Sequence, residues 1–145
     1  MEPAILTIGY EKATQDAVIA RLTAAGVTRL VDVRAVAASR RAGFAKTALA
    51  AGLAEAGIAY THLRALGTPK PGREAARKGR IAEMRVIYDQ ALEAPEAVDA
   101  FAALADLVQQ ERCALLCFEA EAEGCHRRVL TERLSAQLGL AVIDL

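Results

Sequence analysis

Short apolar runs rich in β-branched residues alternate along this chain with stretches that have the spacing of amphipathic helices, and this alternation constrains the fold most. The run at residues 4–8 ends at a Gly-Tyr pair, and the run at 113–118 is continuously apolar. A continuous apolar run of this length is typical of a strand buried on both faces of a parallel sheet. Such runs predict strands at residues 4–8, 29–33, 58–63, 113–118 and 141–143.

The segments between these strands carry apolar residues three or four positions apart, as helices do. Thr14 is suited to cap the first helix, and Gly26 to end it. The spacing predicts helices at residues 14–25, 46–56, 73–92, 95–108 and 125–138. Alternating strands and helices predict an α/β fold: a single three-layer, doubly wound domain with a mainly parallel sheet of about five strands and right-handed crossovers.

Length and composition fit one domain spanning residues 1–145. The chain is 54% apolar but only 4% aromatic, with no Trp. A sizeable core is therefore available without disulfides or metals, built from closely packed Ala, Leu, Val and Ile. Lys and Arg together number 18, as do Asp and Glu. This balance gives no argument from overall charge for a nucleic-acid or membrane partner.

The sequence also predicts a cytoplasmic protein. Its three cysteines are an odd number, and no N-terminal segment has the pattern of a secretory signal. No apolar run approaches the roughly 18 to 20 residues that cross a bilayer. We therefore expect a protein of the reducing cytosol with no membrane partner. No particular cofactor or oligomeric state is indicated.

Most of the chain's unusual polar residues come directly after the predicted strands. In parallel α/β sheets, ligands bind outside the carboxyl ends of the strands, near the point where the strand order reverses. The residues concerned are Tyr10, Asp32, Arg34, His62, Cys117, Glu119 and the run Cys125-His126-Arg127. This clustering predicts a functional site at one edge of the sheet. Coincidence is the alternative, because polar residues follow the strands of many α/β domains.

Six motifs carry a resemblance to a known family. They are Thr7-Ile8-Gly9-Tyr10, Leu30-Val31-Asp32-Val33-Arg34, Ser39-Arg40 with Gly43-Phe44, His62-Leu63 with Leu66-Gly67, Leu115-Leu116-Cys117-Phe118-Glu119, and Cys125-His126-Arg127. In their order and over nearly the whole chain, they resemble the bacterial and archaeal family named domain of unknown function 488. The resemblance implies a compact α/β domain with these motifs at one site, and it implies no particular reaction. The insert at residues 68–80 diverges from the family pattern.

Several residues of the predicted site are suited to an anionic ligand. Guanidinium groups match phosphate or carboxylate with two parallel hydrogen bonds, and a helix that starts at Cys125 would add unpaired N–H groups. The predicted ligand-binding residues are Tyr10, Arg34, Arg40, His62, His126 and Arg127. The alternative is that the arginines pair with Asp32, Glu119 and Glu121 in a surface network.

Three residues are candidates for catalysis. Cys125 at a helix N-terminus, beside His126 and Arg127, is expected to have a lowered pKa and could act as a nucleophile. The Cys-x5-Arg spacing of tyrosine phosphatases is absent, and a buried, inert Cys125 is the alternative. Asp32 and Glu119 could act as general base and acid. The alternative for Asp32 is that it orients Arg34 or caps loop amides.

Metal binding is not predicted, although ligand types suited to zinc are present at Cys117, Cys125, His62 and His126. No Cys-x2-Cys pair occurs, and we expect the adjacent Cys125 and His126 to point in different directions. Cys113 lies roughly 13 Å from Cys117 by strand rise, too far for a disulfide. We expect Cys113 to pack in the core.

The segment from Arg64 to Arg85 is the chain's one basic patch. It carries seven Lys or Arg residues against Glu74 and Glu83, and only Tyr88 is nearby for stacking on bases. The leading hypothesis is an enzyme or sensor for a small phosphorylated or nucleotide-like ligand. The alternative is a noncatalytic nucleic-acid-associated module that uses this patch. The patch could also be a solvated helix face, and a protein-interaction domain is a third possibility.

Overall fold

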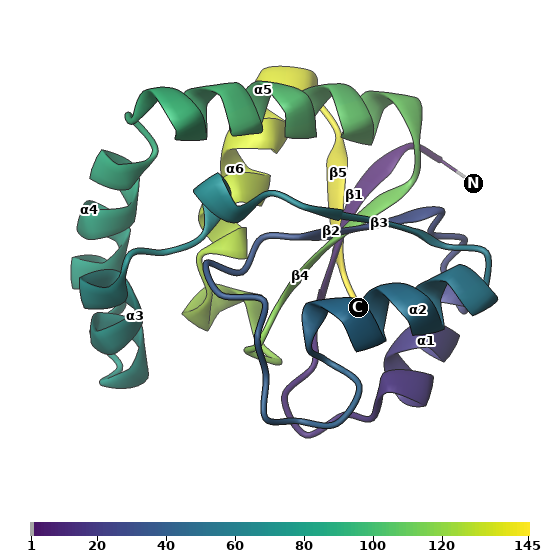
Figure 1. The fold of residues 1–145 in the computed structure, drawn as a ribbon. Helices are drawn as coiled ribbons and strands as arrows, with labels where there is room; N and C mark the ends of the chain where they lie inside the picture. The colour runs from purple at the N-terminus through teal and green to yellow at the C-terminus, as the bar shows by residue number, and fades with distance from the viewer. Residues whose placement is uncertain (1) are drawn as a thin grey trace.

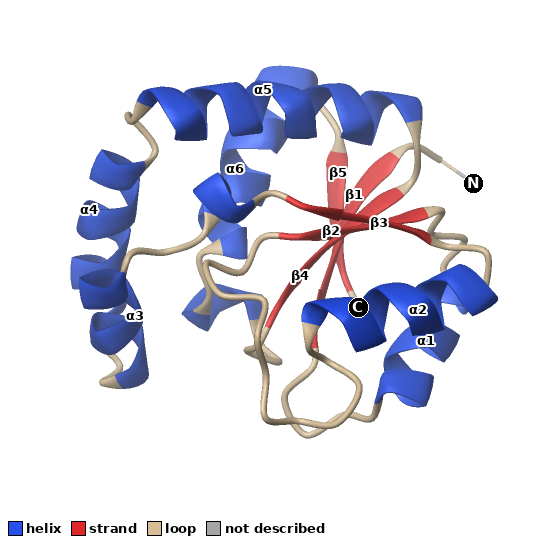
Figure 2. Cartoon of the chain, viewed as in Figure 1, coloured by secondary structure: helices blue, strands red, loops and turns tan. Residues whose placement is uncertain are grey.

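All strands of the sheet run parallel, in the order β3-β2-β4-β1-β5 (Figures 1 and 2). The computed structural model describes residues 2–145. The strands are β1 (Ala4–Gly9), β2 (Arg29–Asp32), β3 (Ala59–His62), β4 (Cys113–Cys117) and β5 (Ala141–Asp144). The predicted α/β class and five-stranded parallel sheet are confirmed.

The helices agree with the predicted ones except in the basic segment and at the start of the last helix, which begins at Arg127 rather than Cys125. The single helix predicted at 73–92 is two helices, because Gly79 has a φ of 76° and turns the chain between them. The α-helices are α1 (Gln15–Ala24), α2 (Lys46–Glu55), α3 (Lys70–Arg77), α4 (Ile81–Ala91), α5 (Pro95–Gln110) and α6 (Arg127–Leu138). Two short 3₁₀ helices, η1 (Arg64–Leu66) and η2 (Ala122–Gly124), were not predicted.

The two faces of the sheet carry separate apolar layers. Successive side chains of a strand point to opposite faces, so Leu115 packs with α4, α5 and α6, whereas Leu116 packs with α1 and α2. All five residues of β4 are buried, as expected for the central strand of a sheet covered on both faces. Figure 1 shows the two groups of helices on either side of the sheet. The predicted three-layer architecture is confirmed.

The chain leaves neighbouring strands toward opposite faces at the carboxyl edge of the sheet. After β1 and β2 it enters α1 and α2, whereas after β4 it enters α6 on the other face. Because β4 lies between β1 and β2, this edge contains the topological switch point at which ligands of such sheets usually bind.

No helix within residues 2–145 combines the length and the apolar character needed to cross a membrane.

Candidate functional site

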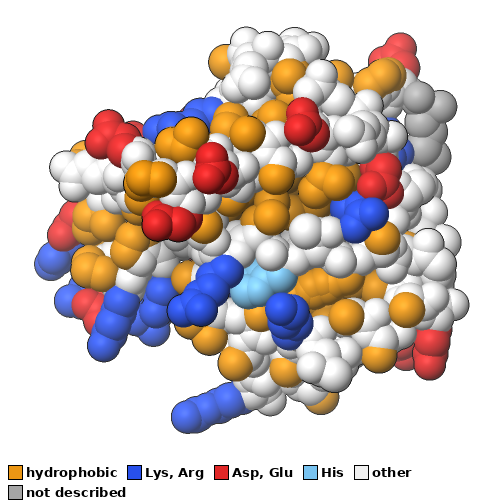
Figure 3. Space-filling view, turned by 45° about the horizontal axis from the view of Figure 1, so that its top comes forward, with side chains coloured by type: hydrophobic (Ala, Val, Ile, Leu, Met, Phe, Trp, Pro, Cys, Tyr) orange, Lys and Arg blue, Asp and Glu red, His pale blue; other side chains and the backbone are white. Residues whose placement is uncertain are grey.

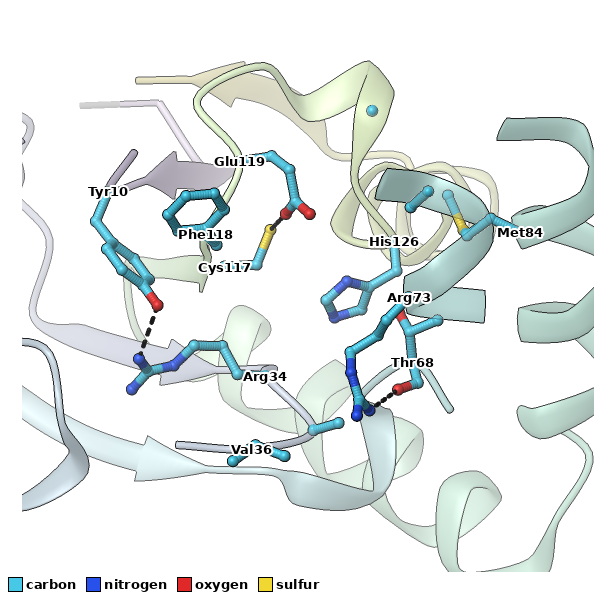
Figure 4. Close-up of a pocket in the computed structure, with 13 residues that line it drawn as sticks. Tyr10, Arg34, Val36, Thr68, Arg73, Met84, Cys117, Phe118, Glu119 and His126 are labelled. Atoms are coloured by element: carbon cyan, nitrogen blue, oxygen red, sulfur yellow. Dashed lines mark hydrogen bonds between the residues drawn. The ribbon is translucent and has the colours of Figure 1, made fainter. Parts of the chain in front are cut away.

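A cavity of about 200 Å³ opens at the switch point. Tyr10 follows β1, Arg34 and Val36 follow β2, and the segment from Cys117 to Glu119 ends β4. Figure 4 shows these side chains on one part of the wall, with Arg73, Thr68 and Met84 across from them. Strand ends that are far apart in the sequence therefore form one pocket with a helical segment.

Asp32 and Arg34 form a buried ion pair beneath this pocket. Arg34 Nε donates to Asp32 Oδ1 at 2.9 Å, and Nη2 donates to Oδ2 at 2.7 Å, so the pair is bidentate. Tyr60 Oη donates to the same carboxylate at 2.5 Å. Burial alone would lower the pKa of Arg34, but the hydrogen bonds and charge of Asp32 outweigh it and raise that pKa. Asp32 is fully buried, and its carboxylate is occupied by partners within the protein.

The two N–H groups on Nη1 of Arg34 are occupied as well. Nη1 donates to Phe44 O at 2.8 Å and to Tyr10 Oη at 3.2 Å. The guanidinium carbon lies 5.4 Å from the centroid of the Tyr10 ring, and that ring stacks on Phe44. Arg34 thus forms part of the pocket wall while its guanidinium binds groups of the protein itself.

Arg127 lies behind the loop that follows β4. It is fully buried, and it donates from Nη1 to Glu119 O at 2.6 Å and from Nη2 to Ala120 O at 3.1 Å. Its Nε is buried without a partner in the described chain, and burial lowers the pKa of its guanidinium. Arg127 therefore supports the loop that carries Glu119 and does not reach the pocket.

Glu119 provides the carboxylate among the residues that line the pocket. It is half-buried at the pocket wall. Burial raises its pKa, an effect partly offset by a backbone hydrogen bond and by the charge of Arg127. Its Oε2 lies 3.2 Å from Cys117 Sγ, a contact marked by a dashed line in Figure 4. A carboxyl group at a cavity wall can donate or accept a proton, and a raised pKa favours its protonated, donating form.

Cys117 and Cys125 are joined by a disulfide, a pairing that the sequence did not predict. Both residues are buried. In this state Cys125 is not a thiolate, so nucleophilic chemistry there would first require reduction of the disulfide. Cys113 is a free, buried cysteine in the core, as expected.

His126 turns toward the same sulfur atoms, so the expectation that Cys125 and His126 point in different directions is wrong. Its Nδ1 lies 3.5 Å from Cys125 Sγ. The physical reason is the backbone: Cys125 is extended, with φ −128° and ψ 147°, whereas His126 has helical angles. Its Nε2 lies 2.6 Å from Val33 O, and burial lowers its pKa to about 4, so the ring is neutral at neutral pH.

The helix start does not offer the unpaired N–H groups that were expected at Cys125. The helix α6 begins at Arg127, two residues later than predicted. The amides of Arg128 and Val129 donate to the carbonyls of Cys125 and His126 at 3.1 and 3.0 Å. These donors are occupied within the chain.

Arg73 is a pocket residue that the sequence did not assign to the site. It was counted only as part of the basic segment, but its side chain lines the cavity and donates to Thr68 O at 2.8 Å (Figure 4). It forms no salt bridge within the described residues 2–145. The available signal was its position directly after the Gly- and Pro-containing segment at residues 67–72, whose last three residues form the first turn of α3.

The two other predicted ligand-binding residues lie outside this pocket. His62 is half-buried, and its Nε2 donates to Arg34 O at 2.8 Å. It lines a separate, more open hollow together with Arg64. Arg40 is exposed in the loop after β2. The structure thus brings Tyr10, Arg34, Glu119 and His126 to the pocket wall.

Comparisons with known proteins give one match. The family model described as Domain of unknown function DUF488 matches residues 14–134, which include most of the pocket. Neither a curated protein nor a solved structure is significantly similar to the chain. Because the family model covers well over half of the sequence, this chain belongs to the family of the domain of unknown function DUF488.

Proposed function

We propose that the pocket at the carboxyl edge of the sheet binds a small phosphorylated or nucleotide-like anion, with Arg73 as its cationic partner. The observation that carries this proposal is that Arg73 lines the cavity with one carbonyl as its hydrogen-bond partner. Its remaining N–H groups are available to a phosphate, for which the guanidinium fork is well shaped. Arg34 and Arg127, by contrast, have their Nη groups on protein acceptors.

The rest of the wall supports a ligand with a flat apolar part. Tyr10 and Phe118 meet edge to face with ring centroids 5.4 Å apart, and 46% of Phe118 is exposed. Val36, which is 56% exposed, adds apolar surface to the same wall. A nucleobase or similar ring could pack on these side chains while its phosphate reaches Arg73.

If the protein is an enzyme, Glu119 is the proton-transfer group that we favour. Its carboxyl group lines the cavity and its pKa is raised by burial, whereas Asp32 is buried beneath Arg34 in a salt bridge. A general acid or base must lie within hydrogen-bond reach of its substrate, and Glu119 satisfies this condition better than Asp32 does. Cys125 could act as a nucleophile only in the reduced protein.

Titration of adenosine monophosphate and of inorganic phosphate into the protein, followed by amide NMR shifts, tests the proposal. We expect saturable shifts around Phe118 and Arg73, with the nucleotide binding more tightly than phosphate. Arg73→Gln should weaken nucleotide binding roughly 10- to 100-fold, the usual effect of losing a charge-assisted hydrogen bond. Arg77→Gln is the matched control, because Arg77 is exposed on the same helix outside the cavity.

An equal loss in both variants would indicate attraction to the general positive charge of α3 and would contradict a pocket site. The absence of a saturable shift with either compound would also contradict it.

A second candidate function, as a nucleic-acid-associated module, is favoured by the surface beside the pocket. Figure 3 shows Lys and Arg side chains gathered on the side of the molecule where α3 lies. Arg77, Lys78 and Arg80 are exposed there, although Arg80 lies 3.8 Å from Glu83, and Arg85 is paired with Glu132. These cations could contact phosphates of a polyanion without reading its sequence.

Binding of a single-stranded oligonucleotide at increasing salt concentration separates the two functions. A phosphate-driven contact should weaken steeply with salt, and Lys78→Gln should reduce the salt slope by about one contact. Binding that is independent of salt, or unchanged in Lys78→Gln and Arg77→Gln, would exclude this module.

A further inference from the structure

Two cysteines and a histidine place potential metal ligands at one point on the wall of the pocket. Among the described residues, one ligand atom each from Cys117, Cys125 and His126 lie within 4.8 Å of one another, and all three residues are buried. Cys117 and His126 also line the cavity, so this cluster faces the space that the proposed ligand would occupy. The two sulfurs and the imidazole are ligand types that zinc prefers.

The imidazole of His126 is held in the orientation that a metal ligand needs. The carbonyl of Val33 can only accept a hydrogen bond, so Nε2, at 2.6 Å from it, must carry the proton. The unprotonated Nδ1 then directs its lone pair toward Cys125 Sγ, 3.5 Å away. A ligating histidine commonly donates its other ring N–H to a carbonyl in this manner, which fixes its tautomer and direction.

The spacing between one cysteine sulfur and the imidazole already fits a tetrahedral ion. With Zn–S bonds of about 2.3 Å and Zn–N bonds of about 2.0–2.1 Å, tetrahedral ligand atoms lie roughly 3.5–3.8 Å apart. The observed 3.5 Å between Cys125 Sγ and His126 Nδ1 matches this range. The Cα atoms of the two cysteines are 7.4 Å apart, wider than the roughly 4.4–6.8 Å that disulfides usually span. The backbone thus leaves room for an ion between the two sulfurs once the disulfide is reduced.

The neighbouring charged groups complete the site. Glu119 Oε2 lies 3.2 Å from Cys117 Sγ, close enough to supply the fourth ligand from the pocket side. Arg127 Nη1 lies 3.1 Å from the same sulfur and would donate to a coordinated thiolate. Two thiolates and one carboxylate would balance a divalent cation and this guanidinium, so the buried cluster would carry no net charge.

We propose that the reduced protein binds one zinc ion through Cys117 Sγ, Cys125 Sγ and His126 Nδ1, with Glu119 at the fourth position. A dithiol reductant converts the disulfide to two thiols and is itself oxidised to a disulfide. The ion then displaces the two thiol protons to solvent as both sulfurs coordinate it. The oxidised and the zinc-bound protein are two alternative states of the same cysteine pair.

The site goes beyond the proposed anion pocket and does not depend on it. Because Glu119 approaches from the cavity side, a ligand in the pocket could replace it at the fourth position, as in zinc sites that keep one exchangeable ligand. Nucleotide binding through Arg73 can be measured in the oxidised, metal-free protein. The failure of one proposal is therefore distinguishable from the failure of the other.

Cobalt substitution in the unmodified chain tests the zinc site. The protein is reduced with a dithiol, freed of reductant under nitrogen and titrated with Co²⁺. We expect thiolate-to-cobalt charge-transfer absorption and intense visible bands of a tetrahedral ion, both saturating at one ion per chain. Zn²⁺ should displace the cobalt and abolish the spectrum. The oxidised protein should bind neither ion.

Variants identify the ligands. Cys117→Ser and His126→Ala should each weaken zinc binding at least about 100-fold, measured by competition with a chromophoric chelator, and Glu119→Gln by roughly 10-fold. Cys113→Ser is the matched control, because Cys113 is a buried cysteine of the same strand outside the cluster. Circular dichroism of each variant verifies folding before the titration.

Four results would overturn the proposal. They are a reduced wild-type chain that binds no ion, a cobalt spectrum without thiolate bands, an equal affinity in the oxidised protein, and an equal loss in Cys113→Ser. The first three need no variant, so the test remains decisive even if a substitution prevents folding.

Discussion

At the scale of single residues, Asp32 shows how burial changes the role of a charged group. Its carboxylate accepts hydrogen bonds from Arg34 and Tyr60, and it has no exposed surface. A buried carboxylate with these partners anchors the loop that follows β2, including the stretch that forms the pocket wall. Its most direct effect is therefore on stability.

We predict that Asp32→Asn destabilises the protein by about 3–5 kcal/mol, because it leaves the Arg34 guanidinium buried without a counter-charge. Combining it with Arg34→Met should cost less than the sum of the two single changes. Urea unfolding measures both effects. Asp89→Asn, which breaks the exposed pair with Arg133, is the control and should cost under about 1 kcal/mol. Wild-type stability in Asp32→Asn, together with lost ligand binding, would assign Asp32 a functional role instead.

At the scale of elements, β1 and the loop after β4 meet at a point that only glycine permits. A Cβ atom added at Gly9 would collide with the backbone of Glu119 and would lie 2.9 Å from the Cα of Ala120. The end of β1 thereby determines the position of the loop that carries Phe118 and Glu119. Gly67 has a comparable close approach to Ala35, which holds the turn before α3 against the loop after β2.

Gly9→Ala is predicted to destabilise the protein by about 1–3 kcal/mol through overpacking against backbone that cannot rotate away. It should also shift the NMR signals of residues 118–120 and weaken nucleotide binding. Gly124→Ala is the control: a Cβ there meets nothing within 4 Å, so the change should stay within about 0.5 kcal/mol. Equal unfolding free energies for the two variants would show that the loop adapts to the added methyl group.

At the scale of the whole molecule, three weak acids with raised pKa values make the fold sensitive to alkaline pH: the buried Cys113 and Tyr88 and the half-buried Tyr60. Burial raises the pKa of Cys113 to about 11. Burial likewise raises the pKa values of Tyr60, whose hydroxyl also donates to Asp32, and of Tyr88, whose hydroxyl donates to Leu66 O. Above their ordinary pKa values of 9.0 and 10.0, these groups ionise more readily in the unfolded chain than in the folded one.

The contribution of these three groups to the free energy of unfolding is therefore predicted to be constant below about pH 9. It should fall as the pH rises through the pKa values that the groups have in the folded protein. For the buried Cys113 and Tyr88, each unit by which the pKa is raised is worth about 1.4 kcal/mol, whereas the half-buried Tyr60 contributes less because solvent screens it. Urea unfolding at increasing pH should show the decline, and Cys113→Ala should reduce its slope. Tyrosinate absorbance from Tyr60 and Tyr88 should appear together with unfolding. Ionisation of both tyrosines in a chain that remains folded would contradict this prediction.

The order and type of most elements could be predicted from the sequence, because they depend on local patterns. The continuous apolar run of β4 follows from its burial on both faces of the sheet. The helical spacing of apolar residues in α1, α2 and α5 follows from burial of one face of each helix. The location of a pocket at the carboxyl edge follows from parallel strands alone. A left-handed glycine at position 79 divided the basic helix, and its conformation depends on how α3 and α4 pack.

Only the tertiary structure decided which polar side chains meet. Arg34 and Arg127 are of a residue type that often binds anionic ligands. In the fold, however, Arg34 is paired with the Asp32 carboxylate, and Arg127 donates to loop carbonyls. Arg73 is one of several similar cations in its segment, and the position of α3 beside the carboxyl ends of the strands brings it to the cavity. Cys117 and Cys125 meet through the loop between β4 and α6. Whether an apolar side chain is buried depends mainly on its own place in the local pattern, so sequence periodicity predicts it. A hydrogen bond or a coordination site needs two or more groups within a few ångströms of one another. Only the folded chain sets those distances.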